Sequence, residues 1–332
     1  MVKAIVVRET GGPEVLRLED ITVGEPGAGE IKLRQTAIGV NFIDVYHRTG
    51  LYSKTAGVSA VESSSFIPGL EGVGLIEAIG PDVEGLKVGD RVCYGNGPLG
   101  GYAEERLIPA KDVVLVPSSL HDEQVAGMML RGMTAWYLLR ATHQLKAGET
   151  VLFHAAAGGV GLIFCQWARH IGATVIGTVG SEEKAEIARA AGCAHTILYK
   201  SEDWVAKVRE LTNGKGVSVV YDGVGKDTFM KSLDCLVTRG LMVAFGNASG
   251  VAPNIEPNLL AAKGSLYLTR PRLADYVGER EEYVRATTEL FDVVVKGAVK
   301  IDAGNSYALE QAVHAHTDLE ARKTTGSTIL VV

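Results

Sequence analysis

The chain has 332 residues, which is too long for one ordinary hydrophobic core and predicts two domains. With 46% hydrophobic and 22% charged residues it has the balance of a soluble globular protein, and its net charge of -6 gives no overall attraction to nucleic acid or anionic membranes. No uncharged apolar stretch is long enough to span a bilayer, and the N-terminus has the pattern of a first strand rather than of a secretion signal.

The cysteines Cys93, Cys165, Cys193 and Cys235 are far apart and include no C-x-x-C pair. This spacing is typical of reduced, mostly buried thiols and not of a disulfide framework. We therefore expect a cytoplasmic protein.

Residues 1–125 are rich in glycine and in short β-like runs separated by turn signals such as Gly11-Gly12-Pro13 and Pro26-Gly27. This pattern predicts a compact, mainly β domain, with strands in KAIVV, EIKLRQTAIGV, GVGLIEAIG, GDRVCYG and DVVLVP. A polar segment rich in small residues lies between Tyr52 and Pro68, and we expect a mobile loop there.

From about residue 126 the pattern changes to strands that alternate with helices, from TVLFHA through TVIGTV, HTILY and VSVVYD to LMVAFG. Such alternation predicts βαβ units with a parallel sheet, over residues 126–265. One helix carries an apolar stripe at Val160, Ile163, Phe164, Trp167 and Ile171, which we expect to pack in the core. Residues 266–332 are expected to return to the first domain through the last strand, STILVV.

A glycine-rich turn joins the predicted strand TVLFHA to this apolar helix. Its pattern, Ala156-x-Gly158-x-x-Gly161, is the dinucleotide fingerprint with alanine in place of the first glycine. Gly158 would let the backbone approach a pyrophosphate, to which the helix N-terminus offers N–H groups. Glycines also form tight turns without any ligand, but the surrounding βαβαβ pattern favours a nucleotide. The residues expected to line this site are Ala157, Gly158, Gly159 and Val160.

The end of the next predicted strand, TVIGTV, bears on the choice between NADP and NAD. NAD sites usually carry a carboxylate there for the ribose hydroxyls, whereas this strand ends in Gly180-Ser181. A 2′-phosphate fits that place, with Lys184 one helical turn away to neutralise it. NAD stays open because Glu182 or Glu183 could approach a ribose and because Lys184 could be an exposed lysine. The missing carboxylate and the available cation together favour NADP.

The segment GETVLFHAAAGGVGLIFCQWAR resembles the quinone oxidoreductase/ζ-crystallin signature of the medium-chain dehydrogenase/reductase superfamily. Other stretches, which together extend over essentially the whole chain, resemble the bacterial NADPH:quinone reductases: GVNFIDVYHRTGLY, MTAWYLLR, VVYDGVG, SLDCL, RGLMVAFGNASG and GSLYLTRP. The resemblance implies an α/β fold, with a Rossmann domain (a doubly wound parallel sheet) and a GroES-like, mainly β domain built from both chain ends. It also implies an active site in the cleft between them, and homodimers or homotetramers.

The resemblance further implies the residues of an NADPH site. The residues on the side of the adenosine 2′-phosphate would be Gly180, Ser181, Lys184, Tyr199 and, from the C-terminal segment, Arg322. The residues around the nicotinamide half would be Phe245, Gly246, Asn247, Leu268, Thr269 and Arg270, with Asn41 and Thr134 close by. The chain departs from the bacterial members in its longer loop after Tyr52, which bears on substrate access.

The zinc alcohol dehydrogenases share the superfamily pattern, but this chain lacks the ligands of their catalytic zinc. Asn41 stands where they carry a cysteine, Leu70 where they carry a histidine, and the stretch MMLRGMTAW supplies neither. A catalytic zinc needs about three protein ligands, so we expect no metal. The pair His314-x-His316 could be imagined as ligands but is expected at an exposed helix edge, and His47 and His154 are expected to pack or to lie at the surface.

Without a metal there is no Lewis acid to polarise an ordinary ketone, so an acceptor that is already electrophilic, such as a quinone, fits best. Asn41, Tyr46 and Tyr52 are the candidates to contact it, through an amide or a hydroxyl that could stabilise charge on its oxygen. The tyrosines could equally be packing aromatics, and Asp44 could orient its neighbours. An NADPH-dependent alkenal or enone reductase and an NADPH-binding structural or RNA-contacting protein stay open, although the net charge of -6 weighs against nucleic acid.

Overall fold

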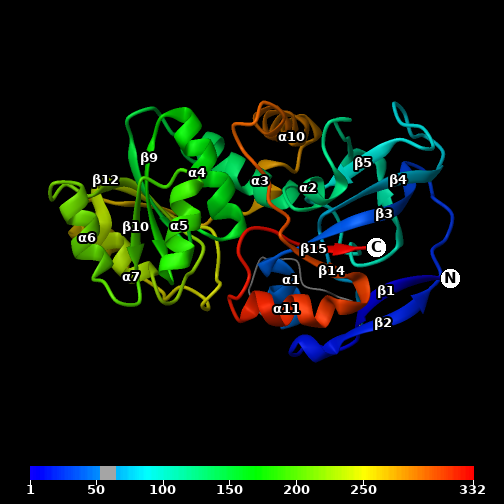
Figure 1. The fold of residues 1–332 in the computed structure, drawn as a ribbon, viewed down its shortest axis with the longest axis horizontal. Helices are drawn as coiled ribbons and strands as arrows, with labels where there is room; N and C mark the ends of the chain where they lie inside the picture. The colour runs from blue at the N-terminus through cyan, green and yellow to red at the C-terminus, as the bar shows by residue number, and fades with distance from the viewer. Residues whose placement is uncertain (53–64) are drawn as a thin grey trace. The chain divides into compact units, whose positions relative to one another are not determined.

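The computed structural model describes residues 1–52 and 65–332, and contacts divide the chain into two compact units (Figure 1). The mainly β unit comprises Met1–Met133, Glu279–Val295 and Ile301–Val332, and the Rossmann unit comprises Thr134–Gly278 and Lys296–Lys300. The loop expected after Tyr52 falls almost wholly on residues 53–64, outside the described residues. In the described parts of the chain, no helix is long and apolar enough to cross a membrane.

The Rossmann unit is built on a six-stranded sheet in the order β10-β9-β8-β11-β12-β13, with every neighbouring pair parallel. Its strands are β8 (Thr150–His154), β9 (Thr174–Val179), β10 (His195–Leu198), β11 (Val217–Asp222), β12 (Leu236–Ala244) and β13 (Tyr267–Thr269). Its helices are α4 (Gly159–Ile171), α5 (Glu182–Ala190), α6 (Trp204–Leu211), α7 (Phe229–Ser232), α8 (Pro257–Ala262) and α9 (Leu273–Tyr276), with a π-helical turn over Tyr137–Thr142. The predicted α/β fold with a parallel sheet is confirmed.

Apolar side chains cover both faces of this sheet because helices pack on both. Leu152 of β8 belongs to a core that also contains Trp204 of α6 and Phe229 of α7. The next residue along the strand points the other way, and the ring of Phe153 lies 4.5 Å from that of Phe164 on α4. Of the predicted stripe on α4, Ile163, Phe164 and Trp167 are buried in the core, whereas Val160 and Ile171 at its ends are half-buried; α5 lies beside α4 (Figure 1).

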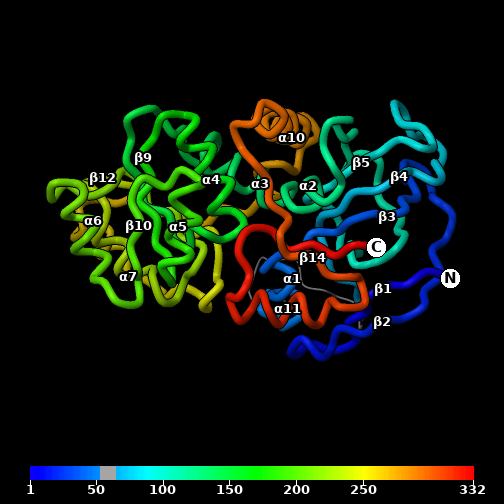
Figure 2. Tube along the Cα trace, viewed as in Figure 1, coloured from blue at the N-terminus to red at the C-terminus, as the bar shows by residue number. Residues whose placement is uncertain are grey.

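The mainly β unit contains a hairpin, β1-β2, and a seven-stranded sheet in the order β14-β15-β3-β4-β5-β7, in which β6 also pairs with β3. The strands from the first part of the chain are β1 (Val2–Val7), β2 (Leu16–Ile21), β3 (Glu30–Val40), β4 (Gly72–Ile79), β5 (Arg91–Tyr94), β6 (Glu105–Pro109) and β7 (Val114–Leu115). From the C-terminal part come β14 (Asn305–Ala308) and β15 (Thr328–Val331). The antiparallel pairing of β15 with β3 brings the chain end back to this domain (Figure 2), whereas residues 266–278, expected to return with it, belong to the Rossmann unit.

The helices of the mainly β unit are α1 (Phe42–Arg48), α2 (Asp122–Ala126), α10 (Arg280–Val295), α11 (Ala312–Glu320) and the first part of α3 (Met129–Trp136), whose residues from Thr134 on belong to the Rossmann unit. Short 3-10 turns lie at Pro13–Val15, Ala110–Asp112 and Leu309–Gln311, and another follows α7 at Leu233–Cys235. Contacts place the main border between the units after Met133, within α3, where the sequence pattern alone suggested residue 126.

Candidate functional site

The sheet of the Rossmann unit has a reversal point next to β8. From β8 the chain continues to β9 and β10 on one side, and it then returns to β11, β12 and β13 on the other. In doubly wound sheets, ligands bind outside the carboxyl ends of the strands at such a point. The residues expected to bind cofactor in this unit lie in the segments that follow β8, β9, β10 and β12 and on or just after β13, apart from Thr134, which is buried in α3.

The turn between β8 and α4 requires glycine and leaves room for a ligand. A Cβ on Gly161 would lie 2.6 Å from the carbonyl oxygens of both Ala155 and Ala156, so the helix packs too closely here for any side chain. A Cβ on Gly158 would meet one described atom within 4 Å, the oxygen of Ala155 at 3.1 Å. Gly158 is the N-cap of α4 and provides no side-chain cap, and the first N–H groups of a helix have no intrahelical acceptor. The turn therefore fits a pyrophosphate.

The segment after β9 brings together residues expected at the 2′-phosphate. A Cβ on Gly180 would lie 3.2 Å from the hydroxyl oxygen of Tyr199, so these two residues are neighbours. Ser181 caps α5, since its Oγ accepts from the backbone N–H of Lys184 at 3.3 Å. Lys184 is half-buried, unlike a lysine on a fully exposed helix face. A phosphate here would meet a hydroxyl, a helix N-terminus and an ammonium group.

Glu182 and Glu183, the two carboxylates that could have indicated NAD instead of NADP, lie on the exposed surface of α5. Glu182 Oε1 accepts from Arg189 Nη2 at 2.6 Å, and both side chains of this pair are exposed. Glu183 is also exposed. Neither glutamate stands at the end of β9, where NAD sites carry their carboxylate, since both lie in the first turn of α5.

The residues expected around the nicotinamide half lie on neighbouring segments. In the pairing of β12 with β13, Met242 is opposite Leu268 and Val243 is opposite Thr269. The guanidinium of Arg270 donates to the carbonyl oxygen of Phe245 at 3.1 Å, which joins the segment after β12 to the end of β13. Residues 245–247 and 268–270 are thus placed side by side.

Sequence reasoning missed the segment after β11. Asp222 is wholly buried and accepts from two backbone N–H groups at 2.8 and 3.0 Å and from the hydroxyl of Thr228. This carboxylate shapes a turn in which a Cβ on Gly223 would lie 2.9 Å from the ring of Phe245. The signal was the aspartate followed by glycines at the end of the apolar run VVYDGVG. The segment lies at the same sheet edge as the expected cofactor residues.

In the mainly β unit, Asn41 begins α1 and is bound to buried carboxylates. Its side-chain Nδ2 donates to Glu71 Oε1 at 2.7 Å, and its backbone N–H donates to Asp44 Oδ2 at 2.8 Å. Glu71, which sequence reasoning missed, also forms an ion pair of 3.3 Å with Arg131. The Asn41 side chain therefore has a fixed partner where the zinc enzymes have a ligand, and its contact with a substrate stays a prediction.

Tyr46 and Tyr52 lie against each other. Their ring centroids are 5.0 Å apart, and those of Phe42 and Tyr46 are 6.1 Å apart. The ring of His47 meets Tyr52 edge-on at 5.7 Å. Tyr46 is buried, and Tyr52 is half-buried. Packing is thus part of the role of both tyrosines, and their contact with a substrate stays a prediction.

Arg322, expected at the 2′-phosphate, follows α11 in the mainly β unit. Its backbone is left-handed, with φ of 58°, and its side chain is exposed. Its backbone N–H donates to the carbonyl oxygen of Leu319 at 3.1 Å, which ends the helix. Its role toward the 2′-phosphate stays a prediction.

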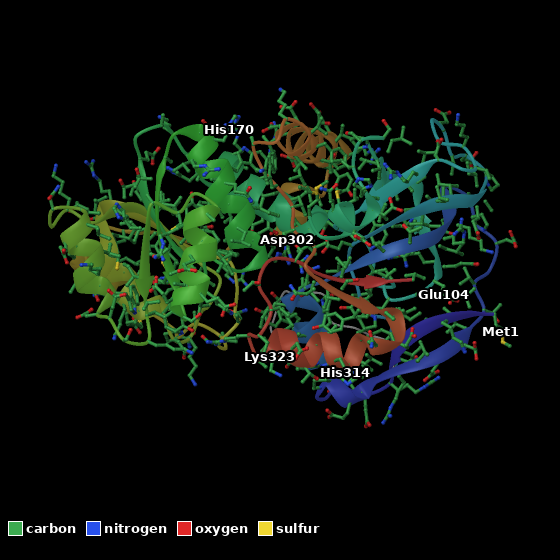
Figure 3. All side chains as sticks on the ribbon, in the orientation of Figure 1. Met1, Glu104, His170, Asp302, His314 and Lys323 are labelled. Carbon is green, nitrogen blue, oxygen red and sulfur yellow. The ribbon has the colours of Figure 1, made fainter. Side chains whose placement is uncertain are left out.

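The histidines differ in part from expectation. His314 is exposed on α11, as expected (Figure 3), but placing its neighbour His316 at an exposed helix edge was wrong, because that residue is wholly buried. Residues two apart on a helix face different directions, so the pair cannot act as joint ligands. His154 is buried between the hydroxyls of Thr178 and Ser232, each at 2.9 Å, and burial lowers its pKa.

Comparison with known families and structures gives two family models that match parts of the chain and relatives that match all or nearly all of it. The sequence models described as alcohol dehydrogenase GroES-like domain and zinc-binding dehydrogenase match residues 27–118 and 159–292. The quinone oxidoreductase of Pseudomonas aeruginosa is 48% identical over 331 residues, covering 100% of both chains. A 2-haloacrylate reductase from a Burkholderia species is also 48% identical, covering 100% of this chain and 99% of the relative. The crystal structure of Escherichia coli quinone oxidoreductase complexed with NADPH matches with a TM-score of 0.95 and 44% identity, covering 99% of this chain and 100% of that one.

Proposed function

Because the chain belongs to the zinc-free quinone oxidoreductases of the medium-chain dehydrogenase/reductase superfamily, it reduces quinones with NADPH, and we propose which of its residues bind the two molecules. The carboxylate-free end of β9 supports NADPH in particular: Gly180 lies beside the Tyr199 hydroxyl, Lys184 follows one turn later, and Glu182 is paired elsewhere.

Each segment of the sheet edge has a part in holding NADPH. The glycine turn and the N-terminus of α4 bind the pyrophosphate through backbone N–H groups. Lys184 and Tyr199, with Arg322, bind the 2′-phosphate by charge and hydrogen bonding. The residues after β12 and β13 flank the nicotinamide, whose hydride is the chemistry that the cofactor supplies.

The acceptor is bound by residues of the mainly β unit. Asn41 offers an amide at the start of α1, and Tyr46 and Tyr52 offer a pair of contacting rings that suit a planar quinone. A quinone needs little activation because it is already electrophilic, and water can protonate the reduced product. The tyrosines therefore shape the pocket rather than act as essential acids.

A second function is favoured by one comparison. The relative named 2-haloacrylate reductase is as similar to this chain as the quinone oxidoreductase is, so a conjugated double bond is a second candidate acceptor. The test is NADPH oxidation by the purified protein with 1,4-naphthoquinone, 9,10-phenanthrenequinone, an acyclic enone and 2-chloroacrylate. A kcat/KM at least as high for 2-chloroacrylate as for the quinones would assign the double bond, and no turnover with any acceptor would refute the proposed function.

We further propose that the chain forms a homodimer or homotetramer and that it acts in the cytoplasm. β13 is the last strand of its sheet, so one edge of it pairs with no described strand, and Tyr267 and Leu268 on it are 61% and 39% exposed. An open edge that bears apolar side chains is suited to pairing with a second copy of the chain. All four cysteines are free and buried, which suits a reducing compartment. Light scattering of the purified protein tests the assembly.

A further inference from the structure

A series of buried polar groups, here called the Arg48–Asp44 chain, begins and ends on α1 and passes through His316 of α11 and through Tyr102. Arg48 Nη1 lies 3.1 Å from His316 Nδ1, His316 Nε2 lies 2.9 Å from the Tyr102 hydroxyl oxygen, and that oxygen lies 3.0 Å from Asp44 Oδ2. Arg48 also forms an ion pair with Glu320 at 2.8 Å. The four side chains of this chain have no exposed surface. Polar groups buried so completely are costly unless they are hydrogen-bonded, so their arrangement is specific.

The donors and acceptors of the Arg48–Asp44 chain have one consistent direction. A guanidinium can only donate, so His316 Nδ1 accepts and the neutral ring carries its proton on Nε2. Burial lowers the pKa of His316 to about 3, which keeps the ring neutral at ordinary pH. His316 Nε2 then donates to the Tyr102 oxygen, which leaves the hydroxyl proton for Asp44. Tyr102 is thereby oriented as a donor to the Asp44 carboxylate.

Two buried carboxylates hold Asn41 from opposite ends of the residue. Asp44 accepts from its backbone N–H, and Glu71 accepts from its side-chain amide. The other oxygen of Glu71 accepts the backbone N–H of Leu130 at 2.6 Å, while Arg131 supplies the balancing charge. Asn41 is therefore held at its backbone by one carboxylate and at its side chain by the other.

We propose that Asp44 and Glu71 are positioning residues for the acceptor end of the site. Asp44 holds the backbone N–H of Asn41, Glu71 holds its side-chain amide, and the hydroxyl of Tyr102 controls how strongly Asp44 binds. The inference rests on the proposed function, in which Asn41 faces the quinone. It goes beyond that function because neither carboxylate needs to touch a substrate.

The strength of the hydrogen bond that Asp44 accepts from the Asn41 backbone depends on the charge of Asp44. Glu71 is paired with Arg131, whereas Asp44 Oδ1 is buried without a hydrogen-bond partner. Burial raises the pKa of Asp44 to about 7, the hydrogen bonds from Asn41 and Tyr102 oppose this rise, and the charge of Glu71 adds to it. The ionisable groups around Asp44 in this network are His47, Arg48, Glu71, Tyr102, Arg131 and His316. Charge-assisted hydrogen bonds are about twice as strong as neutral ones, so this hydrogen bond strengthens as Asp44 ionises.

The first test compares the pH dependence of kcat/KM for 1,4-naphthoquinone in three proteins. In the wild type, we expect kcat/KM to rise as the pH is raised, with an apparent pKa near that of Asp44. In Tyr102→Phe, which removes a hydrogen bond to the ionised form, we expect this rise to move up by about one pH unit, a tenfold change in proton affinity. In Asp44→Asn, which cannot ionise, the rise disappears and kcat/KM stays at the low-pH level.

Tyr307→Phe is the matched control. The Tyr307 hydroxyl donates to Asp318 at 2.9 Å in the same unit. Neither of these residues takes part in the hydrogen bonds that join Arg48, His316, Tyr102, Asp44 and Asn41. Its pH profile should equal that of the wild type. If Tyr102→Phe and Tyr307→Phe give the same profile, or if Asp44→Asn keeps the rise, then Asp44 does not position Asn41.

The second test isolates the contact of Glu71 with Asn41. Glu71→Gln and Glu71→Leu are each combined with Arg131→Met, so that neither protein contains an unpaired buried charge. Gln retains an acceptor for the Asn41 amide and Leu does not, so we expect kcat/KM for the quinone to be about tenfold lower with Leu. Equal values in the two proteins would refute the role of Glu71. Absence of quinone turnover in the wild type would instead refute the proposed function, which separates the two failures.

Discussion

Replacing Asp44 with asparagine should change how the stability of the protein depends on pH. In the unfolded chain the Asp44 carboxyl has its ordinary pKa of 3.8, and burial raises that pKa to about 7 in the fold. Between these values the folded protein binds more protons than the unfolded chain, so the free energy of unfolding falls as pH rises. The contribution of the neutral carboxyl is complete below the lower value and is lost above the higher one. Asparagine does not titrate and therefore lacks this loss.

The size of the effect follows from the two pKa values. Each pKa unit between folded and unfolded states is worth about 1.4 kcal/mol, so the whole loss for the wild type is about 4 kcal/mol. About 2–3 kcal/mol of it falls between about pH 5 and pH 8. As the pH is raised over that range, the free energy of unfolding of Asp44→Asn should increase by this amount relative to that of the wild type. A constant cost of the new amide at Oδ1 would not change this increase.

Urea unfolding of both proteins at these two pH values measures the difference, because all other titrations occur in both and cancel. All three tryptophans, Trp136, Trp167 and Trp204, lie in the Rossmann unit, so far-UV circular dichroism should be recorded beside fluorescence to follow the mainly β unit. Asp302→Asn, at an exposed carboxylate of that unit (Figure 3), should show no such gain. A difference between Asp44→Asn and wild type that is the same at both pH values would refute the reasoning.

Four further outcomes are expected. In steady-state kinetics, Lys184→Ala should raise the apparent KM for NADPH by about tenfold to a hundredfold, since a charge-assisted contact contributes roughly 1.5–3 kcal/mol. The KM for NADH should hardly change, and an equal loss with both nucleotides would contradict a 2′-phosphate contact. Gly158→Ala should weaken NADPH binding in calorimetry with little loss of stability, whereas Gly161→Ala, whose Cβ would lie 2.6 Å from two carbonyl oxygens, should destabilise the fold by about 1–3 kcal/mol; the reverse order would exclude a pyrophosphate at the turn. Elemental analysis should find much less than one zinc per chain, and chelators should leave turnover intact; loss of activity with loss of stoichiometric zinc would overturn the ligand argument. Tyr46→Phe and Tyr52→Phe should be mild, and a hundredfold fall in kcat with unchanged NADPH binding would make that hydroxyl a charge-stabilising donor.

Much of the fold and of the cofactor end of the site could be predicted from the sequence because their signals are local. Alternating strands and helices, a glycine pattern between a strand and a helix, and a strand that ends in Gly180-Ser181 without a carboxylate are all contained in short windows. In a doubly wound sheet, chain order also predicts that the carboxyl ends of the strands meet at one edge. The replacement of a metal ligand by Asn41 is likewise visible in one residue.

The tertiary structure decided what surrounds Asn41. Tyr102 and His316 are 214 residues apart, and Arg48 and His316 are 268 apart, yet each pair is in hydrogen-bond contact in the mainly β unit. The pattern around His316 on α11 is that of an ordinary helix, and Glu71 is one of many glutamates, so no local signal marks either residue. Burial is what makes them specific: without water, each polar group needs a protein partner of the right kind, and only the folding of both chain ends into one unit supplies it.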